Sequence, residues 1–176
     1  MTRRVFFSFH FQADCWRASQ VRNIGAIEGN APCSDNAWEK VKQGGDAAIK
    51  RWIDREMFGK SCLVVLVGSG TAGRKWITHE IVEAWNKKMG VVGVRVNQLL
   101  DVSGSVASSG ANPFEHVKLG DGTLSSVVKL HDPWSIFGST GTYSNIKLNL
   151  AEWIEEAIDI RLNYGKKKSL FDYLVS

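Results

Sequence analysis

The chain has 176 residues, of which 44% are hydrophobic and 23% charged, a composition typical of one globular domain rather than of a disordered chain. No apolar run approaches the roughly 20 residues that cross a bilayer, and the N-terminal apolar run is too short for a signal peptide. The three cysteines lack metal-ligand spacing, and a net charge of +4 without a nucleic-acid-binding motif argues against a nucleic-acid partner. We therefore expect one cytoplasmic domain, residues 1–176, with no metal site and no membrane or nucleic-acid partner.

The first predicted element is an aromatic strand from Arg4 to Phe11, almost at the N-terminus. Its alternation of polar and apolar residues is imperfect, which favours a central strand covered on both faces. Ser8 and His10 would point to one side of this strand, and Phe7 and Phe9 to the other. The end of the strand therefore offers both polar and aromatic side chains to a ligand.

A short helix is predicted next, running to about Asn23, with Asp14 as a plausible N-cap and Trp16 on its apolar face. Residues 25–29 could hold a short second strand. Residues 30–36 form a loop by their Pro, Asn, Asp and Ser content.

The clearest helix in the first half of the chain runs from Gly44 to Phe58, with an apolar stripe and Asp46 as a possible cap. It is followed by Cys62 to Val67, an unbroken valine-rich run closed by Gly68. Such a run is typical of a strand buried on both faces of a parallel sheet. Because ligands of these sheets bind beyond the carboxyl ends of the strands, we expect a site just after this run.

The second half begins with a helix from about Arg74 to Met89, closed by Gly90, and a buried strand from Val91 to Val96. Residues 97–123 are rich in Gly, Ser, Asn and Asp and predict a long irregular excursion, too polar for the core, that borders the site or a partner surface. A last short strand is predicted from Ser126 to His131.

The chain ends with a helix from Lys147 to Leu162, whose apolar face includes Leu148, and a tail at 164–176. The order of the predicted elements is β-α-(β)-α-β-α-β-loop-β-α. This order predicts an α/β protein with a flavodoxin-like three-layer fold, in which helices flank a mostly parallel central sheet.

Three segments, in this order along the chain, carry a family pattern. Val5 to His10 matches an aromatic first-strand box, Cys62 to Ser69 a strand that precedes a catalytic helix, and Trp76 to Ile81 the pattern of Trp, three residues, Glu and an aliphatic residue. With these segments the chain resembles Toll/interleukin-1 receptor (TIR) domains, and more closely the bacterial TIR-like branch of the Thoeris anti-phage defence system, in which Asn112-Pro113-Phe114 also recurs. It departs from TIR domains after the first helix, where no BB-loop consensus is recognisable.

The resemblance implies a function and a substrate. Enzymatic TIR domains cleave the nicotinamide–ribose bond of NAD⁺, which is their substrate, so no separate cofactor is expected. The products are ADP-ribose or cyclic ADP-ribose isomers, and in the Thoeris branch the cyclic product activates a separate effector protein. The resemblance also leaves a homo-oligomer open.

Glu80 matches the catalytic glutamate of the family. Breaking an N-glycosidic bond develops positive charge on the ribose, which a nearby carboxylate can stabilise. The alternative role for Glu80 is a solvent-facing helix residue. Ser8 could hydrogen-bond the substrate, and Phe7 could stack on it or pack in the core. We expect His10 to line the pocket rather than to act as a base, because nicotinamide leaves without taking up a proton.

Further candidates lie in and after the turn at Gly68 to Gly70, which is too short for a P-loop. Ser69 in this turn would approach the substrate. Trp76 lies one helical turn before the glutamate, where it either contacts the substrate or fixes the helix in the core. Arg74 and Lys75 could meet the pyrophosphate or be solvated.

Two other classes remain open. A non-catalytic TIR-type interaction module would use the same fold without needing a carboxylate at position 80. A flavodoxin- or receiver-like protein would share the strand order, but receivers need paired acidic residues at the end of the first strand. This chain has Ser8 and His10 there.

Overall fold

The computed structural model describes residues 3–24, 27–28 and 41–174, with the side chains of 3–24 and 41–165. The predicted loop at 30–36 and most of the predicted strand at 25–29 lie outside the described residues. Five strands form one sheet in which every pair of neighbours is parallel. Their order across the sheet is β2 (Ile27–Glu28), β1 (Arg3–Phe9), β3 (Cys62–Val67), β4 (Gly90–Arg95) and β7 (Leu130–His131).

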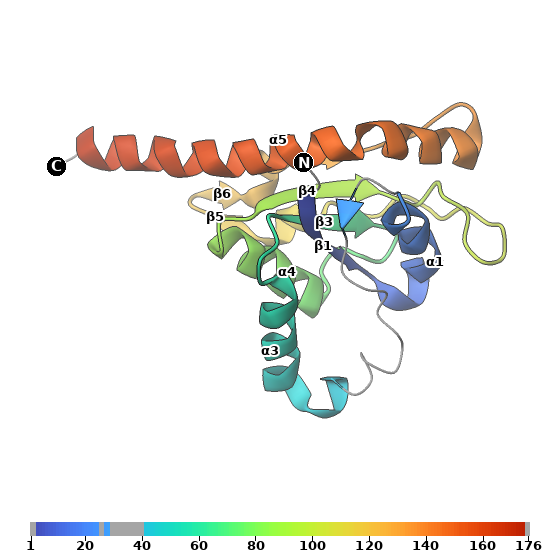
Figure 1. The fold of residues 1–176 in the computed structure, drawn as a ribbon, viewed down its shortest axis with the longest axis horizontal. Helices are drawn as coiled ribbons and strands as arrows, with labels where there is room; N and C mark the ends of the chain where they lie inside the picture. The colour runs from blue at the N-terminus through green and yellow to red at the C-terminus, as the bar shows by residue number, and fades with distance from the viewer. Residues whose placement is uncertain (1–2, 25–26, 29–40, 175–176) are drawn as a thin grey trace.

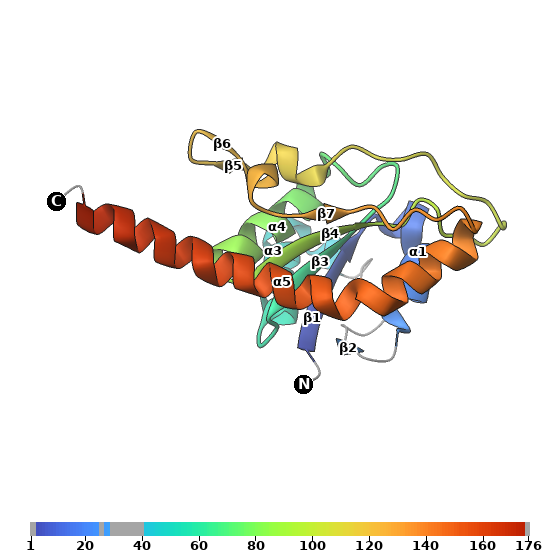
Figure 2. The ribbon, with the colours of Figure 1, turned by 90° about the horizontal axis from the view of Figure 1, so that it is seen from above.

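Helices cover both faces of this sheet (Figure 1). On one face lie α1 (Phe11–Arg22) and α5 (Gly138–Leu174), and on the other α3 (Gly45–Met57) and α4 (Lys75–Asn86). Seen from above, α5 crosses the sheet and continues well beyond it (Figure 2). The predicted α/β fold with a parallel central sheet between helical layers is confirmed.

Strand β3 shows why the fold forms. All six of its residues are buried, as the unbroken apolar run predicts. Leu63, Val65 and Val67 pack against α3 and α4, whereas Val64 and Leu66 pack against α1 and α5. A strand with apolar side chains on both faces can be buried only between two layers, and this requirement sets the three-layer arrangement.

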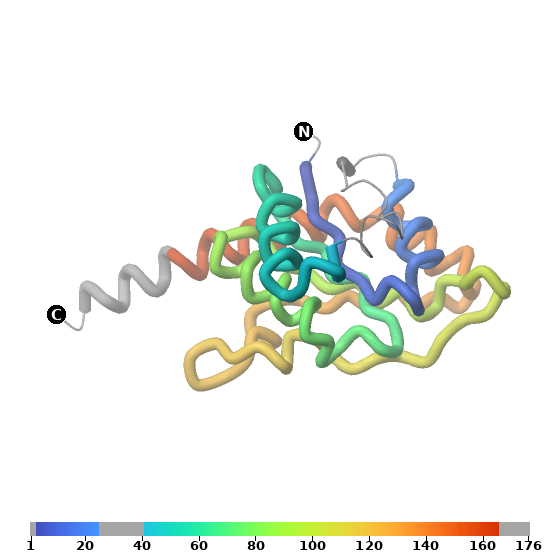
Figure 3. Tube along the Cα trace, turned by 90° about the horizontal axis from the view of Figure 1, so that it is seen from below, coloured from blue at the N-terminus to red at the C-terminus, as the bar shows by residue number. Residues whose placement is uncertain are grey.

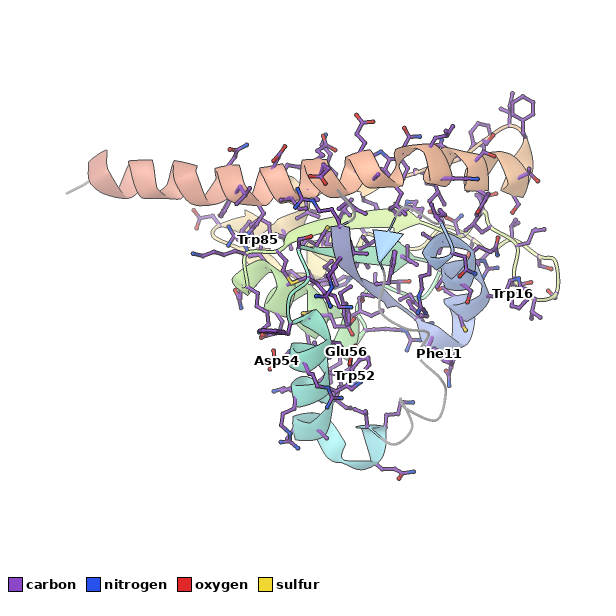
Figure 4. The ribbon with its side chains drawn as sticks, in the orientation of Figure 1. Phe11, Trp16, Trp52, Asp54, Glu56 and Trp85 are labelled. Atoms are coloured by element: carbon purple, nitrogen blue, oxygen red, sulfur yellow. The ribbon has the colours of Figure 1, made fainter. Side chains whose placement is uncertain are left out.

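Helix α1 differs from its prediction. It begins at Phe11, so His10 is the N-cap residue and Asp14 lies inside the helix, where it is buried against Arg17. The prediction of Asp14 as the cap is therefore wrong. Trp16 is 56% exposed and lies on the outer side of α1 (Figure 4). The helix turns its charged pair inward instead, because Arg17 has hydrogen-bond partners in the segment after β4.

Two glycine predictions had different outcomes. Helix α3 is preceded by Gly44 rather than capped by Asp46, and it ends before Gly59, whose φ of 70° is the left-handed conformation expected of a helix terminator. Gly90 does not close α4. Lys88, with φ of 62°, takes the left-handed position, and Gly90 starts β4, where a Cβ would lie 2.7 Å from the backbone nitrogen of Ile158 in α5.

The excursion at 97–123 is polar in composition, but some of its apolar side chains are buried in the core. Its later part contains short elements, and Leu99 and Phe114 are fully buried, so the expectation that it is too polar for the core is wrong for these residues. Isolated apolar residues among glycines and serines form no periodic pattern, so their burial could not be predicted from the sequence. The short elements, which Figure 3 shows beside the body, are η1 (Pro113–His116), β5 (Lys118–Leu119), β6 (Gly122–Thr123) and η2 (Leu124–Ser126).

The last elements also correct the prediction. Of the strand predicted from Ser126 to His131, β7 keeps two residues. Helix α5 begins nine residues before the predicted Lys147 and continues through Leu174, so the predicted tail at 164–176 is helical up to that residue. Leu148 is 81% exposed rather than part of the apolar face. The side chains that α5 buries on the sheet are Ile146, Leu150, Ile154 and Ala157.

Candidate active site

The strongest feature for chemistry is a pair of polar side chains between β1 and α4. The Ser8 hydroxyl donates a hydrogen bond of 2.5 Å to Oε2 of Glu80. Both residues are buried, with Ser8 at 2% and Glu80 at 8% exposure. Ser8 is the penultimate residue of β1, so the pair lies near the carboxyl ends of the strands, where sites of parallel sheets form.

Burial sets the charge of Glu80. It raises the pKa of the carboxyl from 4.5 to about 7, and the hydrogen bond from Ser8 opposes this rise because it stabilises the charged form. Glu80 therefore exchanges its proton near neutral pH, where both the acid and the carboxylate are populated. A carboxyl group tuned in this way is typical of active sites.

The turn between β3 and α4 borders this pair. The Gly68 N–H donates to Oγ1 of Thr71 at 2.8 Å, and Nε of Arg74 donates to the Gly70 carbonyl at 2.7 Å. The ring of His10 lies beside the same turn: its Nδ1 is 3.5 Å from the position that a Cβ of Gly70 would take. The turn thus brings His10 and Arg74 together at the ends of β1 and β3.

Two glycines let other segments approach this turn closely. A Cβ at Gly68 would overlap the carboxylate of Asp14 in α1, and a Cβ at Gly110 would overlap the carbonyl of Gly68. Arg95 holds the excursion here by donating from Nη1 to the Gly110 carbonyl at 2.5 Å. The excursion at 97–123 therefore lies against the turn after β3. That it borders the site or a partner surface stays a prediction.

Sequence reasoning missed the cluster around Arg17. This side chain is 4% exposed and lies 3.3 Å from Oδ1 of Asp14 and 3.3 Å from Oδ2 of Asp101. It also donates to the carbonyls of Leu99 and Ser105, at 2.8 and 3.0 Å, and so ties α1 to the excursion. The opposite charges at positions 14 and 17 were the available signal, since residues three apart share a helix face.

The two aromatic candidates lie in different places. Phe7 is 3% exposed and belongs to the core that faces α1 and α5, on the opposite side of the sheet from Glu80. This placement favours core packing, the other role that the sequence left open for Phe7. Trp76 packs at the border of the core on the α4 side, with its ring 5.8 Å from that of His79 and 4.7 Å from Nζ of Lys75.

The remaining candidates flank the site. Ser69 is exposed in the turn, available to a ligand. Lys75 is paired with Asp46 of α3, which makes it a less suitable anion ligand than Arg74. Glu83, one turn beyond Glu80, is partly exposed and lies 3.8 Å from Lys87. Within the described part of the chain, no group of three or more His, Cys, Asp or Glu side chains could hold a metal ion, and no helix could span a membrane.

Comparison with known proteins agrees with this geometry. The family model of the Thoeris protein ThsB, TIR-like domain, matches residues 6–101, which is more than half of the chain. The chain belongs to the ThsB TIR-like family. The matched range contains the second half of β1, the turn after β3 and all of α4, and therefore both partners of the Ser8–Glu80 hydrogen bond.

A relative of the ThsB TIR-like chain comes from Bacillus cereus (strain MSX-D12) and carries the name "Putative cyclic ADP-D-ribose synthase ThsB1". The two proteins are 34% identical over 122 residues, which cover 66% of this chain and 64% of the relative. The chain thus aligns with less than two thirds of the relative's length.

Proposed function

We propose that this ThsB TIR-like protein cleaves the nicotinamide–ribose bond of NAD⁺ and forms a cyclic ADP-ribose-type product. The observation that carries the proposal is the buried Ser8–Glu80 hydrogen bond near the carboxyl ends of the strands. The name of the Bacillus cereus relative, "Putative cyclic ADP-D-ribose synthase ThsB1", supports the choice of reaction. NAD⁺ is the substrate in this reaction, and no further cofactor is needed.

Glu80 is the catalytic residue of the proposed reaction. As the bond to nicotinamide breaks, its electron pair leaves on the nicotinamide nitrogen and positive charge develops on the ribose. The Glu80 carboxylate stabilises that charge, and the Ser8 hydroxyl holds the carboxylate in place. The low-polarity surroundings of Glu80 strengthen this interaction relative to water.

The substrate-binding roles follow from position. Ser69, His10 and Trp76 lie in or beside the turn and helix that border Glu80, and Arg74 is placed to meet the pyrophosphate. The product would reach a separate effector protein by diffusion, so the effector need not bind this chain. This protein would then act as the signal-producing half of an anti-phage response.

The test is turnover of NAD⁺ by concentrated protein, with products identified by chromatography and mass spectrometry. Glu80→Gln keeps the size and hydrogen bonding of the side chain but removes its charge, and should lower turnover by about 10²–10³-fold. Binding should change less than turnover, because the charge is needed as the bond breaks. Glu83→Gln, one helical turn away, is the matched control. Equal turnover in wild type and Glu80→Gln would overturn the catalytic role of Glu80, whereas no turnover by either protein would favour a non-catalytic interaction module.

A further inference from the structure

His10 has an unusual environment at the end of β1. Its Nδ1 and Nε2 are both buried, and neither has a hydrogen-bond partner within the described part of the chain. The backbone at His10 is still extended, with φ −76° and ψ 103°. The side-chain alternation of β1 therefore carries on, and His10 points to the same side as Ser8, the side on which Glu80 lies.

Packing does not account for this arrangement. A buried polar atom without a partner costs free energy, so such atoms are rare and often have a functional role. A core position would be filled at lower cost by an apolar side chain of similar size. Gly70 adds no side chain over the ring, whose Nδ1 lies 3.5 Å from the position that a Cβ would take there.

The proposed reaction needs a group of this kind in its second step. Nicotinamide leaves with the electron pair of the broken bond and takes no proton. The ribosyl cation is then attacked by a hydroxyl oxygen, whose lone pair forms the new C1′–O bond, and the hydroxyl proton must go to a base. The first step therefore requires a carboxylate, and the second a proton acceptor.

We propose that His10 is the general base of this second step and accepts the proton of the attacking hydroxyl on a ring nitrogen. This inference rests on the proposed function. It also revises the expectation that His10 only lines the pocket, which considered the departure of nicotinamide and not the second step. The hydroxyl belongs to water when the product is ADP-ribose and to a ribose of the substrate when the product is a cyclic isomer closed through oxygen. Ring closure through an adenine nitrogen would need no hydroxyl base, and product analysis separates the three. His10 returns the proton to solvent after the product leaves.

The charged groups around His10 favour its role as a proton acceptor. Burial lowers the pKa of His10, Arg74 lowers it further, and Asp14 opposes both. The ring is consequently neutral and able to accept a proton at neutral pH, and the negative charge of Asp14 stabilises the imidazolium once it forms. Glu80 is less suited to the step, since its Oε2 already accepts the Ser8 hydrogen bond and its charge faces the cation.

The two steps can be measured separately. Exchange of labelled nicotinamide into NAD⁺ needs only cleavage and re-formation of the bond to nicotinamide, so it requires Glu80 but not a base. Formation of ADP-ribose and cyclic products requires both steps. His10→Gln should lower product formation by about 10²-fold or more and lower nicotinamide exchange much less.

His131→Gln is the matched control. His131 also has a lowered pKa, and its buried Nε2 has no hydrogen-bond partner among the described residues, with Oε2 of Glu156 3.8 Å away. It lies on the edge strand β7, with its ring stacked on Trp153 of α5. This variant should retain both activities. If His10→Gln is too unstable to assay, His10→Ala supplied with imidazole replaces it, and restored product formation is then the expected result.

The outcomes separate the two proposals. Product formation in His10→Gln equal to that of His131→Gln would overturn the role of His10, and so would an equal loss of exchange and product formation. If Glu80→Gln keeps full exchange, the proposed function fails, and the inference fails with it.

Discussion

The chain buries two carboxylates near the same end of its sheet, on helices that cover opposite faces. The two carboxylates differ in the partner that lies beside each. Asp14 of α1 is 1% exposed and has the guanidinium of Arg17 beside it. Glu80 of α4 is 8% exposed and accepts a hydrogen bond from the Ser8 hydroxyl. Burial raises the pKa of both, but at Asp14 the positive charge of Arg17 opposes the rise.

The difference separates a structural acid from a reactive one. A buried carboxylate with a cation beside it has its charged form stabilised against the effect of burial, and the pair fixes the segments around it. A buried carboxylate whose partner is a neutral hydroxyl is costly to ionise, and a developing positive charge in a substrate would relieve that cost. The Asp14 region thus anchors the excursion, and the Glu80 region is available for chemistry.

The largest stability effect should come from breaking the structural pair. Arg17→Met leaves the Asp14 charge buried without its cation and removes the hydrogen bonds to the excursion. Loss of one partner of a buried pair costs about 3–5 kcal/mol of unfolding free energy, measurable by urea denaturation. Arg3→Met, which breaks the exposed pair with Glu155, is the control and should change little. Similar midpoints for the two variants would contradict the structural role of Arg17.

The second prediction concerns a substitution that should raise the free energy of unfolding, whereas most substitutions lower it. The pKa of Glu80 is about 7 in the folded protein and 4.5 without the effect of folding. Between these pH values the folded protein therefore binds more protons than the unfolded chain. The cost of ionising Glu80 is absent below pH 4.5 and grows until the pH exceeds about 7. Glu80→Gln should therefore be more stable than wild type at pH 8 by up to about 3 kcal/mol, a gain that disappears toward pH 4.5.

Urea denaturation of both proteins at several pH values checks this prediction, with Glu83→Gln as the control. Glu83 is partly exposed next to Lys87, and its substitution should not produce a gain that rises with pH. A stability difference between Glu80→Gln and wild type that is independent of pH would mean that Glu80 is not buried with a raised pKa. The predicted loss of turnover combined with a gain in stability is the trade-off expected of an active-site acid.

The sequence predicted those parts of the fold and the site that depend on local pattern. The unbroken apolar run at 62–67 set the central strand, and its position placed Glu80 near the carboxyl edge of the sheet. The alternation in β1 put Ser8 on one side of the sheet and Phe7 on the other, where the structure has them. Both inferences require only the alternation of side chains between the two faces of a strand.

The parts that could not be predicted depend on contacts between distant segments. Arg17 is buried because carbonyls of Leu99 and Ser105, more than eighty residues later, accept its hydrogen bonds. Gly90 is required by the approach of α5 rather than by a helix end. Helix α5 starts in a segment of Gly, Ser and Thr with little helical preference, and its packing on the sheet overrides that composition.

The smallest expected effect comes from removing the Ser8 hydroxyl. It tests the comparison most directly, because this hydroxyl is the partner that distinguishes Glu80 from Asp14. The Ser8 hydrogen bond lowers the pKa of Glu80, so Ser8→Ala should raise it further. Nicotinamide exchange requires the charged form of Glu80 and should increase with pH through about 7 in wild type. In Ser8→Ala the midpoint of this profile should move upward by about one to two pH units, since a hydrogen bond to a charged group contributes roughly 1.5–3 kcal/mol. Ser61→Ala, at the opposite end of the sheet, removes a hydroxyl that bonds the Arg4 carbonyl and should leave the midpoint in place. A downward shift in Ser8→Ala, or none, would mean that the hydroxyl does not stabilise the carboxylate.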